Sequence, residues 1–238
     1  MKNDYIKNKY YTKEDITKAK SLCKDFYNKD YAPKLLVSGN KKLGSNVAIW
    51  DIPTGITCKY KCKDCYALKA ERMYKQTRVS RAFKYEIIKE ALKDNTRMEY
   101  LKNYLQVELD RHKLLYKLPV VRIHASGDLF TPKYLAFWLD IIRVNKDISF
   151  YTYTKQLDND TIDLLNKQFK NFNIVKSMID DKYINYGSLD YIEDLIIKLE
   201  AENKPYYVCS YGFEGNYKTC MGDCTACLSC PNVIFKKH

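Results

Sequence analysis

The sequence predicts an α/β fold in which parallel strands form a partial (βα) barrel, with an N-terminal helical extension and a C-terminal cysteine-rich metal-binding tail. From residue 119 onward, short apolar strand patterns alternate with helical patterns of about 10–15 residues. Repeated strand–helix units imply a parallel sheet with right-handed crossovers. Five such strands are expected over the whole chain, fewer than the eight of a closed barrel. We therefore expect an open barrel.

The first half of the chain is predicted to be mainly helical around one hairpin. Thr12 is expected to cap the first helix, with Asp15 three positions later, and Asn95 to cap the last helix of this half. The expected order is helix 13–28, strand 35–37, a turn at Gly39–Asn40, strand 47–52, a cysteine loop, and helices 67–92 and 96–116.

The second half alternates regularly. Thr131 is expected as an N-cap, with Pro132 in the first turn of its helix. The expected order is strand 119–124, helix 131–144, strand 148–153, helix 161–169, strand 172–179, helix 188–200 and strand 206–209. We divide the chain into an extension over 1–45, a barrel over 46–208 and a tail over 209–238.

Composition predicts a cytoplasmic protein with no membrane partner. No apolar run approaches the roughly 20 residues of a membrane span, and Met1–Tyr5 lack the apolar segment of a secretion signal. In a reducing compartment, nine cysteines favour metal ligation or catalysis over disulfides. Cys23, alone in the first helix, is expected to be a buried apolar residue.

The net charge of +12 favours a polyanionic partner such as nucleic acid. The chain is also rich in Lys, Asn, Ile and Tyr, as coding from an AT-rich genome produces without selection for binding. Six basic residues between positions 66 and 84 drift around a helix, and a solvated face is expected there, with phosphate contact as the alternative. They are Lys69, Arg72, Lys75, Arg78, Arg81 and Lys84.

Cys58, Cys62 and Cys65 form a Cys-x3-Cys-x2-Cys array between a strand and a helix. Soft thiolates select iron–sulfur clusters, zinc or copper(I). Three thiolates would leave one iron of a [4Fe–4S] cluster open, whereas a structural zinc needs four closed ligands. The spacing and location favour the cluster, with zinc as the alternative.

A second motif, Ser126-Gly127-Asp128, follows an apolar strand. In α/β folds, ligands gather at the carboxyl ends of strands. The alternative is a turn that places Asp128 near a helix N-terminus, where anions are favoured.

Together these two motifs, in this order, resemble the radical S-adenosylmethionine (SAM) superfamily. The resemblance implies that Cys58, Cys62 and Cys65 are catalytic ligands of a [4Fe–4S] cluster whose open iron binds SAM. One electron would cleave the C5′–S bond, giving methionine and a 5′-deoxyadenosyl radical. Ser126-Gly127-Asp128 would be a shortened form of the family's Gly-Gly-Glu motif, which holds the SAM amino group.

The resemblance implies further SAM contacts. The family has an aromatic residue just before the third cysteine, where this chain has Asp64, and Tyr66 is expected to take its place. His124 would contact the cofactor or relay a proton, unless its ring is satisfied by backbone. Thr154 and Ser177 occupy strand-end positions at which the family contacts the ribose or adenine.

Five further cysteines lie in the tail, and four of them suffice for a closed site. The choice is between a zinc knuckle and a second, auxiliary [4Fe–4S] cluster, as many radical SAM enzymes carry in a C-terminal extension. From Gly44 to the C-terminus the pattern also resembles a group of small phage-encoded radical-SAM-like proteins. The tail cysteines are Cys209, Cys220, Cys224, Cys227 and Cys230.

We therefore expect a radical SAM enzyme acting on a nucleic acid or nucleotide, with a peptide as second choice. Its electron donor would be a low-potential ferredoxin or flavodoxin, at about −400 mV. The rival hypothesis is a non-catalytic iron–sulfur or zinc nucleic-acid-binding protein of a phage or prophage. The two differ over SAM, which only the enzyme would consume.

Overall fold

The computed structural model describes residues 8–40, 43–58, 65–176, 186–187, 189–208, 226–230 and 232–236. The helices are α1 (Lys13–Tyr27), α2 (Tyr66–Met73), α3 (Lys75–Ala91), α4 (Asn95–Leu115), α5 (Pro132–Val144), α6 (Asn159–Gln168), α7 (Leu189–Ala201) and α8 (Ala226–Ser229). The strands are β1 (Val37–Asn40), β2 (Leu43–Trp50), β3 (Val120–Ile123), β4 (Ser149–Thr154), β5 (Phe172–Lys176), β6 (Tyr186–Gly187), β7 (Tyr207–Val208) and β8 (Val233–Lys236).

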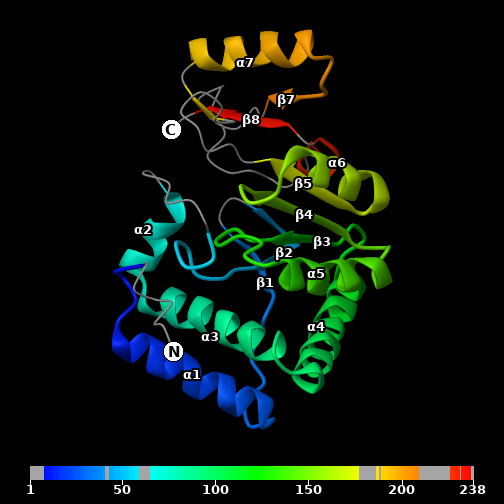
Figure 1. Cartoon of the computed structure of the whole chain (residues 1–238). Coiled ribbons are helices and arrows are strands. Elements are labelled where there is room, and N and C mark those ends of the chain that lie inside the picture. The colour runs from blue at the N-terminus through cyan, green and yellow to red at the C-terminus, as the bar shows by residue number, and fades with distance from the viewer. Residues whose placement is uncertain are drawn as a thin grey trace.

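The main sheet has the strand order β1-β2-β3-β4-β5. Strands β2 to β5 pair in parallel, and β1 adds an antiparallel edge through its hairpin with β2 (Figure 1). The expected parallel α/β sheet is thus confirmed for β2 to β5, and over the described residues this sheet is open. The last expected parallel strand, 206–209, is wrong in its place: it is the short β7, which belongs to a separate sheet with β6 and β8. The first strand of the hairpin starts at Val37 and the second at Leu43, so both are displaced from the expected 35–37 and 47–52.

Alternating side chains of β2 face two different layers. Ala48 and Trp50 join the large core, in which α3, α4 and α5 cover one face of the sheet, as Figure 1 shows. Val47 and Ile49 point to the other face, where they pack with Leu228 of α8. Parallel sheets are usually buried on both faces, and here helices cover one face while the short α8 lies against the other.

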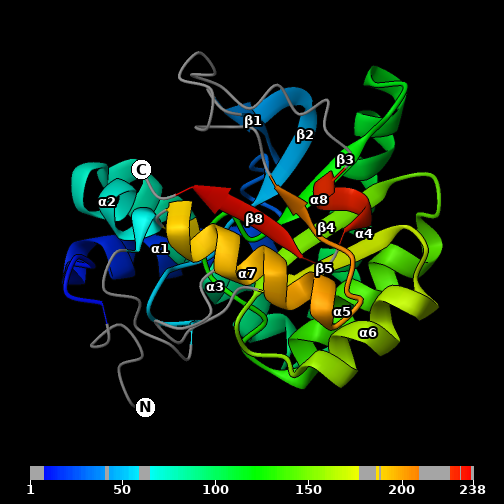
Figure 2. The same cartoon turned by 90° about the horizontal axis from the view of Figure 1, so that it is seen from above.

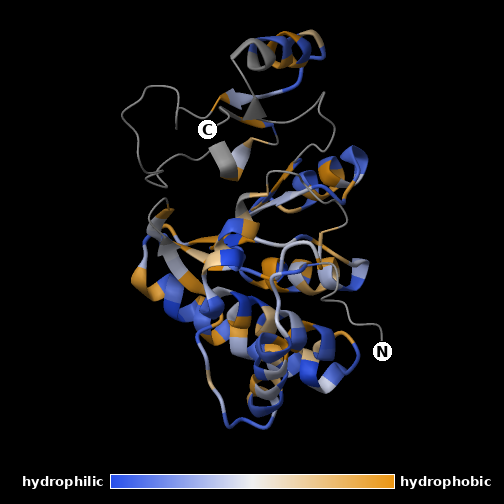
Figure 3. Cartoon of the chain, turned by 90° about the vertical axis from the view of Figure 1, so that its left-hand side faces the viewer, coloured by the Kyte–Doolittle hydropathy of each residue, from blue (hydrophilic) through white to orange (hydrophobic). Residues whose placement is uncertain are grey.

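The second face also carries the C-terminal elements. Strands β6, β8 and β7 form a small parallel sheet that packs with α7, above the main sheet in Figure 1 and in front of it in Figure 2. The side chain of Asn173 in β5 donates to the Cys230 carbonyl at 3.0 Å. Colouring by hydropathy shows helices that carry hydrophilic and hydrophobic residues on different faces (Figure 3).

Helix caps explain where several elements begin. Thr12 and Asp15 form the expected reciprocal capping box of α1, and Thr131 caps α5, with Pro132 in the first turn.

Cys23 is buried in α1 as expected and belongs to the same core as α3. Among the described helices, none is long and apolar enough to cross a bilayer.

The expected single helix over 67–92 is wrong, because the chain breaks at Tyr74 into α2 and α3. Tyr74 has an extended backbone (φ −122°, ψ 112°), its N–H closes α2 on the Ala70 carbonyl, and its own carbonyl accepts the first bond of α3 from Arg78. The N-cap of α4 is Asp94 instead of Asn95, since its carboxylate accepts the N–H groups of Thr96 and Arg97.

Candidate functional site

The two ends of the cysteine loop, Cys58 and Cys65, lie at the carboxyl edge of the parallel strands. Cys58 ends the segment that follows β2, and Cys65 is the N-cap residue of α2. Both residues are partly exposed. Cys62 lies outside the described residues, so the structure brings the first and third cysteines of the array to this edge and is silent on the second.

Electrostatics at Cys58 show which groups are near. Burial raises the pKa of its thiol to about 12, and the nearby Asp128 carboxylate and Cys65 add to the effect. Hydrogen bonds from the Gly55 backbone and the Thr57 side chain oppose it. A thiol in such a place is protonated at neutral pH unless a cation replaces the proton, which is what metal ligation does.

Ser126 connects the end of β3 to the segment that precedes Cys58 through hydrogen bonds. Its hydroxyl donates to the Ile52 carbonyl at 3.0 Å and lies 2.8 Å from the Thr54 hydroxyl. Its N–H donates to Asp51 Oδ1 at 2.9 Å. The hydroxyl predicted to bind a cofactor is therefore engaged in holding the segment that leads from β2 to Cys58.

Gly127 fits a space too small for any other residue. Its φ is +90°, and an added Cβ would lie 2.3 Å from Ile52 Cγ1, 2.9 Å from Thr57 Oγ1 and 3.0 Å from the Ile52 carbonyl oxygen. Close approach of two backbones with positive φ is the setting that requires glycine. The motif thus packs directly against the segment before Cys58.

Asp128 joins the ends of β3 and β4. Its Oδ1 accepts the Thr154 hydroxyl at 2.6 Å and the Leu129 N–H at 2.7 Å, and Oδ2 accepts the Lys155 N–H at 3.0 Å. Asp128 is 4% exposed as a residue. Burial raises its pKa, while these donors hold the pKa down. Asp128 and Thr154, each predicted to contact the cofactor, are joined to one another by a direct hydrogen bond.

The turn after β4 makes a further hydrogen bond to the segment that precedes Cys58. Gln156 Nε2 donates to the Thr57 carbonyl at 2.9 Å. The residue immediately before Cys58 is therefore held from a third strand end.

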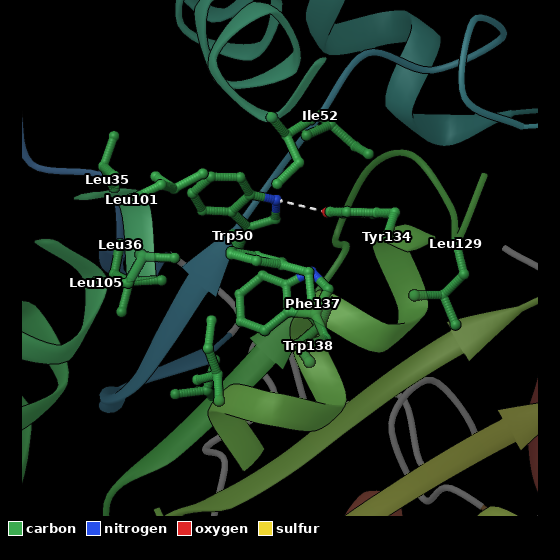
Figure 4. Close-up of a cluster of buried hydrophobic side chains, with 14 of the residues drawn as sticks. Leu35, Leu36, Trp50, Ile52, Leu101, Leu105, Leu129, Tyr134, Phe137 and Trp138 are labelled. Carbon is green, nitrogen blue, oxygen red and sulfur yellow. Dashed lines mark hydrogen bonds between the residues drawn. The ribbon is translucent and has the colours of Figure 1, made fainter. Parts of the chain in front are cut away.

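His124 belongs to a buried network beneath the strand ends. Its φ is +67°, and its Nε2 lies 2.8 Å from the Tyr134 hydroxyl. The same hydroxyl accepts the Trp50 indole N–H at 2.9 Å, as Figure 4 shows. Burial lowers the pKa of His124 to about 3, with Arg122 contributing, so the ring is neutral. Among the described residues, its Nδ1 has no hydrogen-bond partner.

Buried charged residues, whose role was not predicted from the sequence, hold the segment that precedes Cys58. Glu71 of α2 is fully buried: Oε1 accepts the Thr54 N–H and Arg81 Nη1, each at 3.0 Å, and Oε2 accepts Asn8 Nδ2 at 2.6 Å. Arg81 also reaches Asp51 Oδ2 at 3.4 Å. Glu71 thus ties the chain ahead of Cys58 to the helix that follows Cys65.

The expected solvated face over residues 69–84 is wrong at its C-terminal end. Arg81 and Lys84 are 8% and 2% exposed. The break at Tyr74 turns α3 so that these two residues face the core, whereas Lys69, Arg72 and Lys75 remain exposed. No local sequence signal marks the break at Tyr74. The prediction of one continuous helix therefore put Arg81 and Lys84 on the solvent-exposed face.

The remaining predicted positions are described only in part. Tyr66 is the first residue of α2, and Cys227 lies in α8. Cys230 is partly buried beside β5. In the part of the chain that the structure describes, no three His, Cys, Asp or Glu side chains gather as a metal site. Ser177, Cys209, Cys220 and Cys224 lie outside that part.

The family model for gene product 88 matches residues 27–232. The chain belongs to the gene product 88 family. The expected membership of the radical SAM superfamily, and the likeness to radical-SAM-like phage proteins, is therefore wrong: the model that matches is this phage family's own, not a radical SAM model. The cysteine spacing and the Ser-Gly-Asp motif alone did not suffice to identify the family.

Two curated relatives carry the same family name. The Gene 88 protein of Mycobacterium phage L5 is 30% identical over 151 residues, which cover 59% of this chain and 61% of that protein. The Gene 88 protein of Mycobacterium phage D29 is 32% identical over 94 residues, 39% of this chain and 38% of that protein. The chain thus spans less than two thirds of each relative's length. No solved structure matches it.

Proposed function

We propose that this gene product 88 protein is an iron–sulfur enzyme that cleaves SAM reductively and acts on a nucleic acid or nucleotide. The observation that carries the proposal is the position of Cys58 and Cys65 at the carboxyl edge of a parallel sheet, within electrostatic reach of each other. Ligand sites in open α/β sheets form at this edge. The proposal rests on these residues and not on membership of any SAM-dependent family.

The donor set fits such a group. Cys58 and Cys65 are partly exposed thiols that bound a loop with a third cysteine in sequence, Cys62. All-thiolate ligation suits iron–sulfur clusters. If Cys58, Cys62 and Cys65 held a [4Fe–4S] cluster, one iron would be free of protein ligands, and the group would supply a low-potential electron for breaking the sulfonium C–S bond of SAM.

The chain's own residues would hold the loop and shape its surroundings. Ser126 and Gln156 fix the segment before Cys58, and Glu71 fixes Thr54 to α2. Asp128 places a carboxylate beside Cys58. Since three of its acceptor positions are used by neighbouring donors, its part in binding a cofactor amine would use the remaining lone pair of Oδ2.

The finer parts of the proposal concern architecture and partners. Strands β2 to β5 would form the wall of a partial barrel, with the cysteine-rich tail carrying an auxiliary [4Fe–4S] cluster across its inner face. The contact of Asn173 with the Cys230 carbonyl supports that placement of the tail. A ferredoxin or flavodoxin would supply electrons, and the charge of +12 supports a polyanionic substrate.

The test is anaerobic reconstitution with iron and sulfide, followed by a dithionite-driven assay for 5′-deoxyadenosine. The wild type and Cys23→Ala, which removes a buried thiol far from the loop, should bind similar iron and form the product. Cys58→Ala and Cys65→Ala should lose the loop's share of the iron and all of the product.

The contrary result is also defined. A colourless protein that takes up zinc alone, ignores SAM and retains oligonucleotide binding in Cys58→Ala would support the rival nucleic-acid-binding protein and remove the enzyme proposal.

A further inference from the structure

A cavity away from the cysteine loop opens between α1, residues 31–34 and α3. Its volume is about 460 Å³, within the range of small-molecule sites. We call it the lysine pocket, because four lysines line it and no acidic residue does; Tyr31 and Phe83 add an aromatic wall, with ring centroids 5.6 Å apart. The four lysines are Lys18, Lys34, Lys75 and Lys84.

Lys84 is an unusual lining residue because it is buried. It is 2% exposed, and no carboxylate among the described residues lies within 4 Å of its ammonium group. The ammonium lies 5.5 Å from the Trp50 ring centroid, which offers only partial compensation. Buried charges are normally paired and hydrogen-bonded. Lys84 therefore lacks the close anion that its burial calls for.

The nearest acids are committed elsewhere. Asp51 and Glu108 act on Lys84 only from longer range. Glu108 accepts the N–H groups of Leu35 and Leu36, each at 2.7 Å. These backbone bonds hold its carboxylate against residues 35–36, and Glu108 is not among the residues that line the pocket.

The rim lysines differ in how far they are engaged. Lys75 pairs with Glu14 at 2.5 Å on the exposed surface, and Lys34 donates to the Ser38 hydroxyl at 2.8 Å. Lys18 is exposed and, within the described chain, has no carboxylate in ion-pair range. An anion entering the pocket would thus meet Lys18 at the rim and Lys84 at depth.

We propose that the lysine pocket binds the phosphate group of a nucleotide, with Lys84 as its buried counter-charge. Lys18 and Lys34 attract the anion at the rim, and the ring edges of Tyr31 and Phe83 lie beside the base. The phosphate comes either from a free nucleotide or from a nucleic-acid strand. This proposal is independent of the cysteine loop and stands if the loop proves to hold zinc.

The test measures binding of three probes by isothermal titration at constant ionic strength: inorganic phosphate, deoxyadenosine 5′-monophosphate and a ten-residue oligothymidylate. Lys84→Met keeps the apolar stem and removes the charge. Lys133→Met, at an exposed lysine in the first turn of α5, makes the same change in net charge elsewhere. We expect Lys84→Met to weaken binding at least about tenfold and Lys133→Met to leave it unchanged.

The probes identify the source of the phosphate. Tighter binding of the mononucleotide points to a free nucleotide, and tighter binding of the oligomer points to a strand, provided that Lys84→Met weakens both. Lys18→Met, which changes an exposed side chain and spares the fold, should weaken binding about two- to fivefold. Absence of wild-type binding to all three probes, or equal affinities in Lys84→Met and Lys133→Met, overturns the proposal.

Discussion

Substituting Gly127 by alanine tests how tightly the end of β3 packs on the cysteine loop. The new Cβ would lie 2.3 Å from Ile52 Cγ1 and 2.9 Å from Thr57 Oγ1, at a φ of +90°. Positive φ costs a residue with a Cβ about 1–2 kcal/mol, and forcing an extra carbon into a packed site costs about 1–3 kcal/mol. We therefore expect Gly127→Ala to lower the free energy of unfolding by about 2–5 kcal/mol.

The assay is urea unfolding followed by circular dichroism at 222 nm, with linear extrapolation to water. Gly44→Ala is the matched control, because Gly44 lies in β2 without a positive φ, and a compatible Gly→Ala change stabilises by about 0.4–1 kcal/mol. Equal midpoints for Gly127→Ala and the wild type would refute the packing of Gly127 against Ile52 and Thr57.

Three further predictions concern buried polar groups. Tyr134→Phe removes the hydroxyl shared by Trp50 and His124 and should cost about 2–4 kcal/mol in urea unfolding; an unchanged midpoint would contradict the network. Burial lowers the pKa of His124 from 6.5 to about 3, so its contribution to stability is complete above pH 6.5 and is lost as the pH falls toward 3. Between pH 6.5 and 4.5 the wild type should lose about 1.4 kcal/mol per pH unit more than His124→Asn, and parallel curves would exclude that role. Burial lowers the pKa of Lys84 from 10.5 to about 8, so its charged form costs stability below pH 8. Lys84→Met should be more stable at pH 7 by about 1–3 kcal/mol, with the difference closing between pH 8 and 10.5; a less stable variant at pH 7 would show that the ammonium is well compensated.

Structural features that depend on a few neighbouring residues, such as helix caps, could be predicted from the sequence. The reciprocal cap of Thr12 and Asp15 and the Thr131-Pro132 start of α5 depend on short-range geometry, and both are confirmed. The parallel sheet could be predicted because strand–crossover–strand units allow few arrangements. The contact of Asp128 with Thr154 was not predicted, although it is consistent with the same rule, since Asp128 follows β3 and Thr154 ends the neighbouring β4.

Features that depend on helix orientation could not be predicted. Nothing near Tyr74 resembles a helix breaker: no proline or glycine lies between positions 66 and 92. The break depends on tertiary contacts, in which α2 turns to bring Glu71 to Thr54 and α3 brings Arg78 to Asp15. The family could not be predicted either, because a three-cysteine spacing is compatible with more than one family.

The buried charges bear on where the function lies. Desolvating Glu71 and Arg81 costs several kcal/mol per ion, and well-packed apolar residues often stabilise a core as well or better. The charges instead fix the relative positions of these segments. Glu71 accepts the Thr54 N–H and pairs with Arg81. Arg81 also pairs with Asp51, which accepts the Ser126 N–H. This chain of contacts runs from the helix after Cys65, through the segment before Cys58, to the end of β3. Since it fixes the approach to Cys58 and Cys65 without using a thiol, we expect the scaffold to stay folded whether or not these cysteines hold a metal.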